Sequence, residues 1–365
     1  MRISRAQALS WRMGRHFLTG GADTAEDVVA RLGAVPAVSG DADLAVRRRM
    51  TDSAPGEVAR ALESGRLMKT YAFGGATYLM DPARAGRYLA LRAAGRMWER
   101  SSWIGHYRLE PEDWPPLREI VRGLVADGPI TREQLIAGVT AHARFAHLGP
   151  GLAHTGETLL KPFAWQGDLC FGPGREGVRT FQSPAASPTW SAIPGLEDAG
   201  PAAVAAYFDA YGPATLDHAA HWLGSGLGAG RRRITAWVGD LAGKLAEVTV
   251  AGEPMLVSRE HLDGLDAQAE TTAVTLLPGH DQWVLGPGTA DERIVPAQRR
   301  KAVTRGANLV LATGVVSGTW KAGAETLAVS WFAEAGGPPR GAIESEAARL
   351  AALLGRDLTV AIDVT

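Results

Sequence analysis

Histidine and cysteine, the residue types that most often bind metals or carry out redox chemistry, are few and scattered in this sequence. None of the nine histidines forms a His-Glu-x-x-His pattern. His218 and His221 lie three residues apart on a predicted helix, where one face would present both rings. A metal site and a place on the helix surface or at the core edge both fit this spacing, and we favour the second. Cys170 is the single cysteine, which excludes an internal disulfide and a cysteine-rich zinc site.

The segment Gly224–Gly230 is rich in glycine and lies between two predicted helices. A dinucleotide-binding loop follows a strand, so this context excludes that function. The glycines precede Arg231–Arg233, near the start of a helix predicted over 229–241. Free backbone N–H groups and three guanidinium groups would form an anion site there. The alternative is a solvated helix face with ion pairs to Asp240 or Glu247, and the sequence leaves both open.

Charge is balanced over the whole chain but not along it. The 38 basic and 39 acidic residues give a net charge of −1, so nothing global indicates a nucleic-acid or membrane partner. Residues 1–122 hold 19 Lys or Arg and 14 Asp or Glu, a local excess of +5, and the remainder sums to −6. The basic residues are 33 Arg and 5 Lys. The planar fork of the Arg guanidinium suits phosphate oxygens, so the excess of Arg over Lys could reflect phosphate binding. A GC-rich coding sequence gives the same excess of Arg, and we favour that explanation.

Size and hydropathy predict a globular protein of two to four compact units. The chain has 365 residues, of which 46% are hydrophobic, and this excludes a disordered chain. No run of about 18 apolar residues predicts a transmembrane helix. The first 18 residues carry charges throughout, unlike a secretory signal, so we expect a cytoplasmic protein.

The elements that would position these residues follow a repeated order. Helices predicted over 5–18, 25–32, 41–50 and 55–63 precede a hairpin of 67–73 and 76–80, linked by Gly74-Gly75. Helices followed by a hairpin are the outline of a winged helix. Two later stretches repeat it, and they share Gly-Pro-x-Thr at 128–131 and 212–215, a spacing of 84 residues. Thr131 and Gln134 form a candidate capping box for the helix after the first of these.

The fold prediction is therefore α+β, with three tandem winged-helix units at 1–110, 111–190 and 197–268. A β-rich C-terminal domain is predicted at 270–365. Its expected strands are 273–277, 308–312, 314–320 and 327–332, followed by a closing helix over 344–354 and a strand over 358–364.

Five segments resemble, in order, the AlkZ/YcaQ-like winged-helix DNA glycosylases. They are Ser4–Leu9, Leu67–Met80, Lys161–Trp165, Leu277–Trp283 and Gly314–Trp320. The resemblance covers roughly residues 4–335 and implies three winged helices and a β-rich domain around a concave channel for double-stranded DNA. It also implies excision of alkylated purines, including cross-linked guanines, without a metal or other cofactor. The candidate DNA-contacting residues are Arg231, Arg232, Arg233, Lys69, Lys161 and Arg66.

One departure from the family pattern concerns the chemistry directly. The family's Gln-x-Gln or Gln-x-Asp motif aligns with Pro36-Ala37-Val38, and neither Pro36 nor Val38 has a polar side chain. An N7-alkylated guanine is already a cationic leaving group, so the enzyme chiefly supplies a positioned water and stabilises an oxocarbenium-like sugar. A pyrrolidine ring and an isopropyl group do neither.

Nearby polar residues are candidates for replacing the motif. They are Ser39, Asp41, His280 and Asp281. For Asp41 and Asp281 we favour the structural interpretation, in which each carboxylate caps or braces a helix or turn.

Three functions remain open on the sequence. The first is a DNA-binding, DNA-repair-type protein of this family whose base excision is lost or altered. The second is an active glycosylase for alkylation damage that uses a different water-positioning residue. The third is a scaffold or a binder of a planar small molecule, for which the 11 tryptophans would suit stacking.

Overall fold

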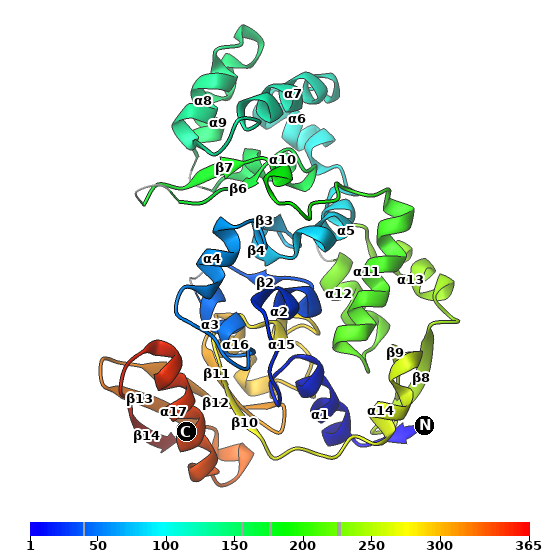
Figure 1. The fold of residues 1–365 in the computed structure, drawn as a ribbon. Coiled ribbons are helices and arrows are strands. Elements are labelled where there is room, and N and C mark those ends of the chain that lie inside the picture. The colour runs from blue at the N-terminus through cyan, green and yellow to red at the C-terminus, as the bar shows by residue number, and fades with distance from the viewer. Residues whose placement is uncertain (39–40, 155, 175–176, 225–227) are drawn as a thin grey trace. The chain divides into compact units, whose positions relative to one another are not determined.

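The computed structural model describes residues 1–38, 41–154, 156–174, 177–224 and 228–365, and it is a mixed fold of helices and sheets (Figure 1). The predicted α+β class is confirmed. Two compact units divide the chain. Unit 1 comprises Met1–Glu57, Ala205–Trp222 and Gly239–Thr365, and unit 2 comprises Val58–Val204 and Leu223–Val238. None of the described helices combines the length and the apolar character needed to cross a membrane.

The C-terminal part of unit 1 is a five-stranded sheet covered by a helix. The strands follow the order β10 (Val274–Leu277), β11 (Asn308–Ala312), β12 (Val315–Ala322), β13 (Thr326–Trp331) and β14 (Thr359–Val364). All neighbours are antiparallel except β13 and β14, which are joined by α17 (Arg340–Leu354). Figure 1 shows α17 lying against these strands, where Ile343 and Leu350 pack with Trp331. The predicted strands are confirmed, and the closing helix begins four residues earlier than expected.

The N-terminal helix α1 (Arg5–Arg15) completes a second core of unit 1. Ser4 caps it, because its hydroxyl accepts a hydrogen bond from Gln7 N at 2.9 Å. Leu9 and Met13 pack with the fully buried Trp283. Strand β1 (Arg2–Ile3) pairs in parallel with β8 (Leu245–Val250), whose other neighbour is β9 (Glu253–Ser258).

The described chain also contains the following helices and one short strand. They are α2 (Ala25–Leu32), β2 (Val35–Pro36), α3 (Ala42–Arg47), α4 (Glu57–Glu63), α5 (Pro82–Ala93), α6 (Ser101–Tyr107), α7 (Trp114–Leu124), α9 (Gly149–Ala153), α14 (Leu262–Asp266), α15 (Gln282–Leu285) and α16 (Arg300–Thr304).

In unit 2, five strands lie in one sheet in the order β4 (Ala76–Met80), β3 (Met68–Ala72), β6 (Cys170–Phe171), β7 (Thr180–Gln182) and β5 (Ile130–Thr131). The predicted hairpin β3–β4 is present, but its turn differs from the two-glycine link that we expected. Ala72 pairs with Ala76, so three residues form the turn. Phe73 and Gly75 both have positive φ, 42° and 89°. The turn therefore needs Phe73 in a left-handed conformation in addition to its glycines.

The two Gly-Pro-x-Thr segments adopt matching roles. In the first, Ile130 pairs with Phe181, and Thr131 forms the predicted capping box with Gln134 at the start of α8 (Arg132–Thr140). In the second, Ala214 bridges to Leu256, and the Thr215 hydroxyl accepts from His218 N near the start of α12 (Leu216–Gly224). Each segment thus adds a strand residue to a sheet and then begins a helix.

Close packing fixes the approach of α11 (Leu196–Tyr211) to α13 (Arg231–Asp240) within unit 2. A Cβ placed on Gly200 would lie 2.2 Å from the Trp237 ring. No side chain larger than glycine fits there unless the indole moves.

Candidate functional site

The positions predicted to align with the family motif hold an exposed apolar side chain. Pro36 ends β2 and is partly buried, Ala37 is buried, and Val38 is 68% exposed. Ser39, one of the candidate substitutes, lies outside the described residues. The polar groups that the motif would supply are therefore missing at Pro36 and Val38, and an isopropyl group faces solvent there.

Asp41 precedes α3, but it does not cap that helix as predicted. Its side chain makes no capping hydrogen bond. Its backbone ψ of 3° differs from the extended value at a typical N-cap. Within the described ranges its carboxylate has no hydrogen bond or ion pair, so it is available to solvent or to a ligand.

Asp281, in contrast, is fully used as a structural brace. It is 2% exposed, and Arg49 binds it with two hydrogen bonds, Nη1 to Oδ2 at 2.8 Å and Nη2 to Oδ1 at 2.7 Å. Oδ1 also accepts from Trp283 N at 2.8 Å, so Asp281 caps α15. The structural interpretation of Asp281 is confirmed. A buried carboxylate whose two oxygens are both bound by protein donors is not positioned to activate water.

His280 lies beside this brace in a strained backbone conformation, with a φ of 56°. Its ring packs on the backbone of Gly306, because a Cβ built on Gly306 would meet His280 Cε1 at 2.4 Å. The contact explains why His280 is half-buried, and it gives the ring a packing role.

The three arginines at the start of α13 are all exposed. Arg233 donates to the Ala229 carbonyl at 3.3 Å, and in the described part of the chain neither Arg232 nor Arg233 forms an ion pair with Asp240 or Glu247. The glycine-rich segment before them includes residues 225–227, which lie outside the described residues. The anion-site interpretation stays a prediction, and the geometry leaves Arg232 and Arg233 accessible.

A basic–aromatic face, defined here by four cations above buried rings, lies on unit 2. The pairs are Arg92 over Trp165 (4.1 Å), Lys161 over Tyr71 (5.7 Å), and Lys69 and Arg179 both over Phe171 (5.6 and 5.5 Å). The rings themselves are at most 7% exposed. The Arg179 side chain is 59% exposed and meets the solvent, whereas Nε and Nη1 of Arg92 are buried against the ring that they cover.

Two of these cations, Lys69 on β3 and Lys161 at the start of α10 (Lys161–Trp165), were predicted from the sequence as DNA contacts. Arg92 and Arg179 were not. Arg179 lies just before β7, two residues before Phe181. Because alternate residues of a strand point to the same face, this spacing could have predicted that Arg179 lies on the same face as Phe181. Burial and the Arg92 charge lower the pKa of Lys161. The predicted contact Arg66 is exposed, and its Nε donates to Ser64 Oγ at 3.1 Å.

Glu157 anchors one edge of this face. It is 6% exposed and accepts hydrogen bonds from Tyr71 and Arg132, and from Arg179 at 2.7 Å. One negative charge thus meets two guanidinium groups. The carboxylate holds Arg179 by one nitrogen and is itself fully occupied.

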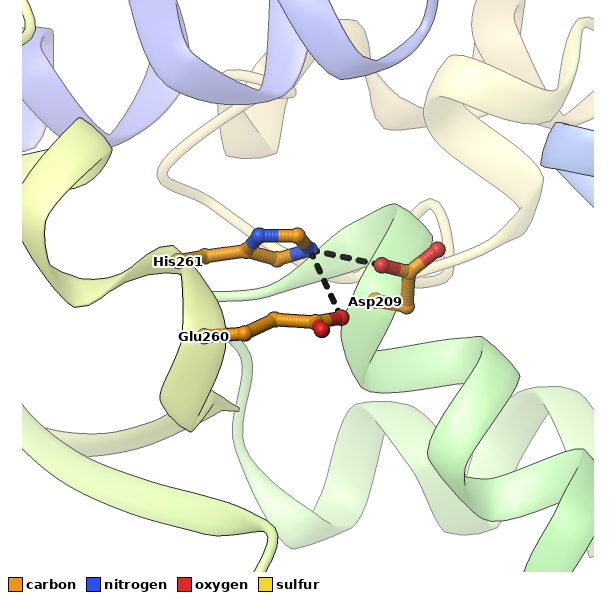
Figure 2. Close-up of side chains that lie close together, drawn as sticks. All are labelled: Asp209, Glu260 and His261. Atoms are coloured by element: carbon orange, nitrogen blue, oxygen red, sulfur yellow. Dashed lines mark hydrogen bonds and ion pairs between the residues drawn. The ribbon is translucent and has the colours of Figure 1, made fainter.

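A metal-type cluster of Asp209, Glu260 and His261 exists in unit 1, and Figure 2 shows the His261 ring turned toward Asp209. His261 Nε2 lies 2.6 Å from Asp209 Oδ1. Arg15 and Arg31 also bind the two Asp209 oxygens, at 2.7 and 2.5 Å. Two guanidinium groups at the same carboxylate repel a divalent cation, so this arrangement acts as an ion-pair network.

The predicted pair His218 and His221 occupies helix α12. Nε2 of His218 lies 2.6 Å from Arg293 Nη2, and its Nδ1 accepts from Thr215 N at 3.4 Å. Both ring nitrogens of His218 are therefore engaged by protein atoms. His221 packs on Gly288, where an added Cβ would lie 2.9 Å from its ring. Burial lowers the pKa of both histidines.

The folded chain combines helices followed by hairpins with a cluster of four cations, features that many nucleic-acid-binding proteins share. The family model described as "DNA glycosylase AlkZ-like" matches residues 29–353. The chain belongs to this AlkZ-like DNA glycosylase family. It is 36% identical over 363 residues to an interstrand DNA cross-link repair glycosylase from Streptomyces sahachiroi, covering 97% of this chain and 98% of that protein. The solved structure of Streptomyces sahachiroi DNA glycosylase AlkZ matches with a TM-score of 0.94 and 35% identity over the full length of both chains.

Proposed function

We propose that this protein binds double-stranded DNA, alkylated or cross-linked, and that its base excision is lost or strongly reduced. The observation that carries the proposal is the 68% exposed Val38, together with Pro36, where the family motif supplies two polar side chains. The family membership supports DNA as the ligand, and the name of the Streptomyces relative supports cross-linked DNA.

The order of elements supports tandem winged helices as the DNA-binding scaffold. Helix, short strand, two helices and a hairpin follow one another as α2, β2, α3, α4, β3 and β4. A similar order recurs from α7 to β7, with additional short helices, and from α11 to β9, with Ala214 as the short strand. In this scaffold α13 would be the groove-facing helix of the third unit, and Arg232 would contact phosphates.

Chemistry explains why the replaced motif matters more than an ordinary surface change. Cleavage of the glycosidic bond needs an oriented water and negative charge near the developing positive sugar. Losing one such positioned group costs about 10²–10³ in rate. Asp281 does not compensate, because Arg49 neutralises it in a buried pair.

A second candidate function is an active glycosylase that uses Asp41. The specific observation in its favour is that the Asp41 side chain makes no capping bond and stands three residues after Val38. An ionised carboxylate there could orient water and stabilise the sugar cation.

An excision assay separates the two candidates. DNA containing N7-methylguanine is incubated with the natural protein, with Asp41→Asn and with the double variant Pro36→Gln/Val38→Gln. The proposal expects the natural protein to release base at least about 10²-fold more slowly than the double variant does, or not at all. Release by the natural protein that Asp41→Asn abolishes would establish the second candidate instead.

DNA binding is tested separately, by mobility shift at about 50 and 200 mM salt. A protein that contacts phosphates loses affinity steeply between these concentrations. Absence of binding at the lower concentration would refute the proposal and leave a scaffold or small-molecule binder on this fold.

A further inference from the structure

A pocket of about 270 Å³ opens on unit 2, at one edge of the basic–aromatic face. Its charged lining residues include Lys69 and Arg179, and its apolar wall contains Leu62, Met68 and Pro173. The pocket lies within one unit, and the motif residues Pro36 and Val38 do not line it.

Strand pairing explains why two cations reach the same pocket. Lys69 on β3 is directly opposite Phe171 on β6, and Phe171 is opposite Phe181 on β7. Opposite residues share a face, and so does Arg179, two residues before Phe181. The Lys69 ammonium and the Arg179 guanidinium consequently converge on the Phe171 ring, 5.6 and 5.5 Å from its centroid.

Counted over the described residues, the two cations carry more charge than the carboxylates that bind them. Among the described residues Lys69 has no carboxylate partner, and Arg179 gives one nitrogen, Nη1, to Glu157. The donors Nε and Nη2 of Arg179 bind no described protein atom. Glu63 is the one carboxylate among the described lining residues, and it forms no ion pair with Lys69. Burial and the Arg179 charge lower the pKa of Lys69.

We propose that this pocket binds the phosphate group of one nucleotide, with Lys69 and Arg179 as its ligands. An Arg fork and a Lys point charge together hold a phosphate, and the apolar wall accommodates the attached sugar or base. The phosphate belongs either to a DNA strand, in which case the site rests on the proposed function, or to a free nucleotide. Both sources present the same chemistry to the two cations.

Amine acylation followed by mass spectrometry tests the site on the unaltered protein. Acylation requires a neutral and accessible amine, so the Lys69 rate is measured with and without ligand, and the exposed Lys321 is the internal reference. A bound phosphate both covers Lys69 and raises its pKa. At a ligand concentration of about ten times Kd, the Lys69 rate should fall roughly tenfold, while Lys321 stays constant.

Three probes are compared, namely a duplex oligonucleotide, deoxyadenosine 5′-monophosphate and inorganic phosphate. Protection of Lys69 by the duplex alone supports a strand phosphate, and protection by the mononucleotide supports a free nucleotide. Mononucleotide protection without any duplex binding would uphold this site and refute the proposed function. A duplex that binds while none of the probes protects Lys69 would overturn the site and leave DNA binding intact.

A variant gives an independent measurement by calorimetry. Lys69→Gln should raise the Kd of the nucleotide ligand that protects Lys69 by roughly tenfold, since the substitution removes one charge-assisted hydrogen bond. The matched control Lys321→Gln should leave the affinity unchanged. Arg179 is unsuited to this test because it also holds Glu157. Equal affinities for the natural protein and Lys69→Gln would contradict the proposal.

Discussion

The Arg49–Asp281 pair offers the most direct test of the structural reasoning. Both side chains are at most 1% exposed, and the bidentate geometry satisfies the charge of each. Asp281→Asn keeps an oxygen for the Trp283 backbone N–H but presents an amide donor to Arg49. A buried guanidinium then loses its counter-charge, which typically destabilises a protein by about 3–5 kcal/mol.

Asp81 is a matched control for this substitution. It also caps a helix, with Oδ1 accepting from Ala83 N at 3.0 Å, and it also pairs with an arginine. That partner, Arg84, is 51% exposed, so Asp81→Asn should cost at most about 1 kcal/mol. The two substitutions therefore differ chiefly in whether the remaining charge is buried.

The assay is equilibrium urea unfolding followed by circular dichroism and fluorescence. Adding Arg49→Met to Asp281→Asn should recover at least half of the lost stability, because it removes the orphaned charge. A loss below about 1 kcal/mol for Asp281→Asn, or a loss equal to that of the control, would refute the assignment of Asp281 as a buried brace.

Three further predictions concern DNA binding, packing and pH. Arg232→Ala should weaken binding to all duplex sequences about equally. It should also lower the slope of log affinity against log salt concentration by about 1, as measured by titration at several salt concentrations. The control Arg340→Ala, at another exposed arginine, should change neither the affinity nor the slope. Gly200→Ala should lose about 1–3 kcal/mol of stability in urea unfolding because it displaces the indole above it, whereas Gly239→Ala, which meets open space, should not. Burial lowers the pKa of His16 well below its usual value, so unfolding takes up a proton. Stability should be fully present above about pH 6.5 and fall as the pH drops below it, and His16→Gln should flatten that part of the profile in pH-dependent thermal scans.

Local signals in the sequence predicted much of the fold correctly. The strands over 308–312 and 327–332 are apolar runs bounded by turn residues, and the caps Ser4 and Thr131 act on amides three residues away. Such interactions depend on neighbours along the chain, so residue types and spacing suffice to predict them.

Contacts between residues far apart in the sequence could not be predicted from local signals. Asp281 pairs with a residue 232 positions earlier, and no pattern near either residue indicates that partner. The hairpin turn at 73–75 includes a non-glycine residue with positive φ, which propensity does not predict. Arg92 reaches the basic–aromatic face because α5 packs beside α10, and that placement depends on tertiary structure. The sequence thus predicted Lys69 and Lys161 of the candidate site, but it did not predict Arg92, Arg179 or the carboxylate Glu157 that pairs with Arg179.

Unit 1 is built from three separate segments of the chain, and this has a consequence for folding during synthesis. Strand β1 pairs Arg2 with Thr249, Arg15 binds Asp209, and Arg49 binds Asp281, so these contacts of the first 57 residues wait until parts of the chain beyond residue 204 have been made. At about 5–20 residues per second, a ribosome takes roughly 10–40 s to reach residue 239 after residue 57. Most of unit 2 emerges in that interval and can fold first. The N-terminal segment must meanwhile keep the apolar face of α1 from binding elsewhere, which makes it the natural place for a chaperone to engage the nascent chain.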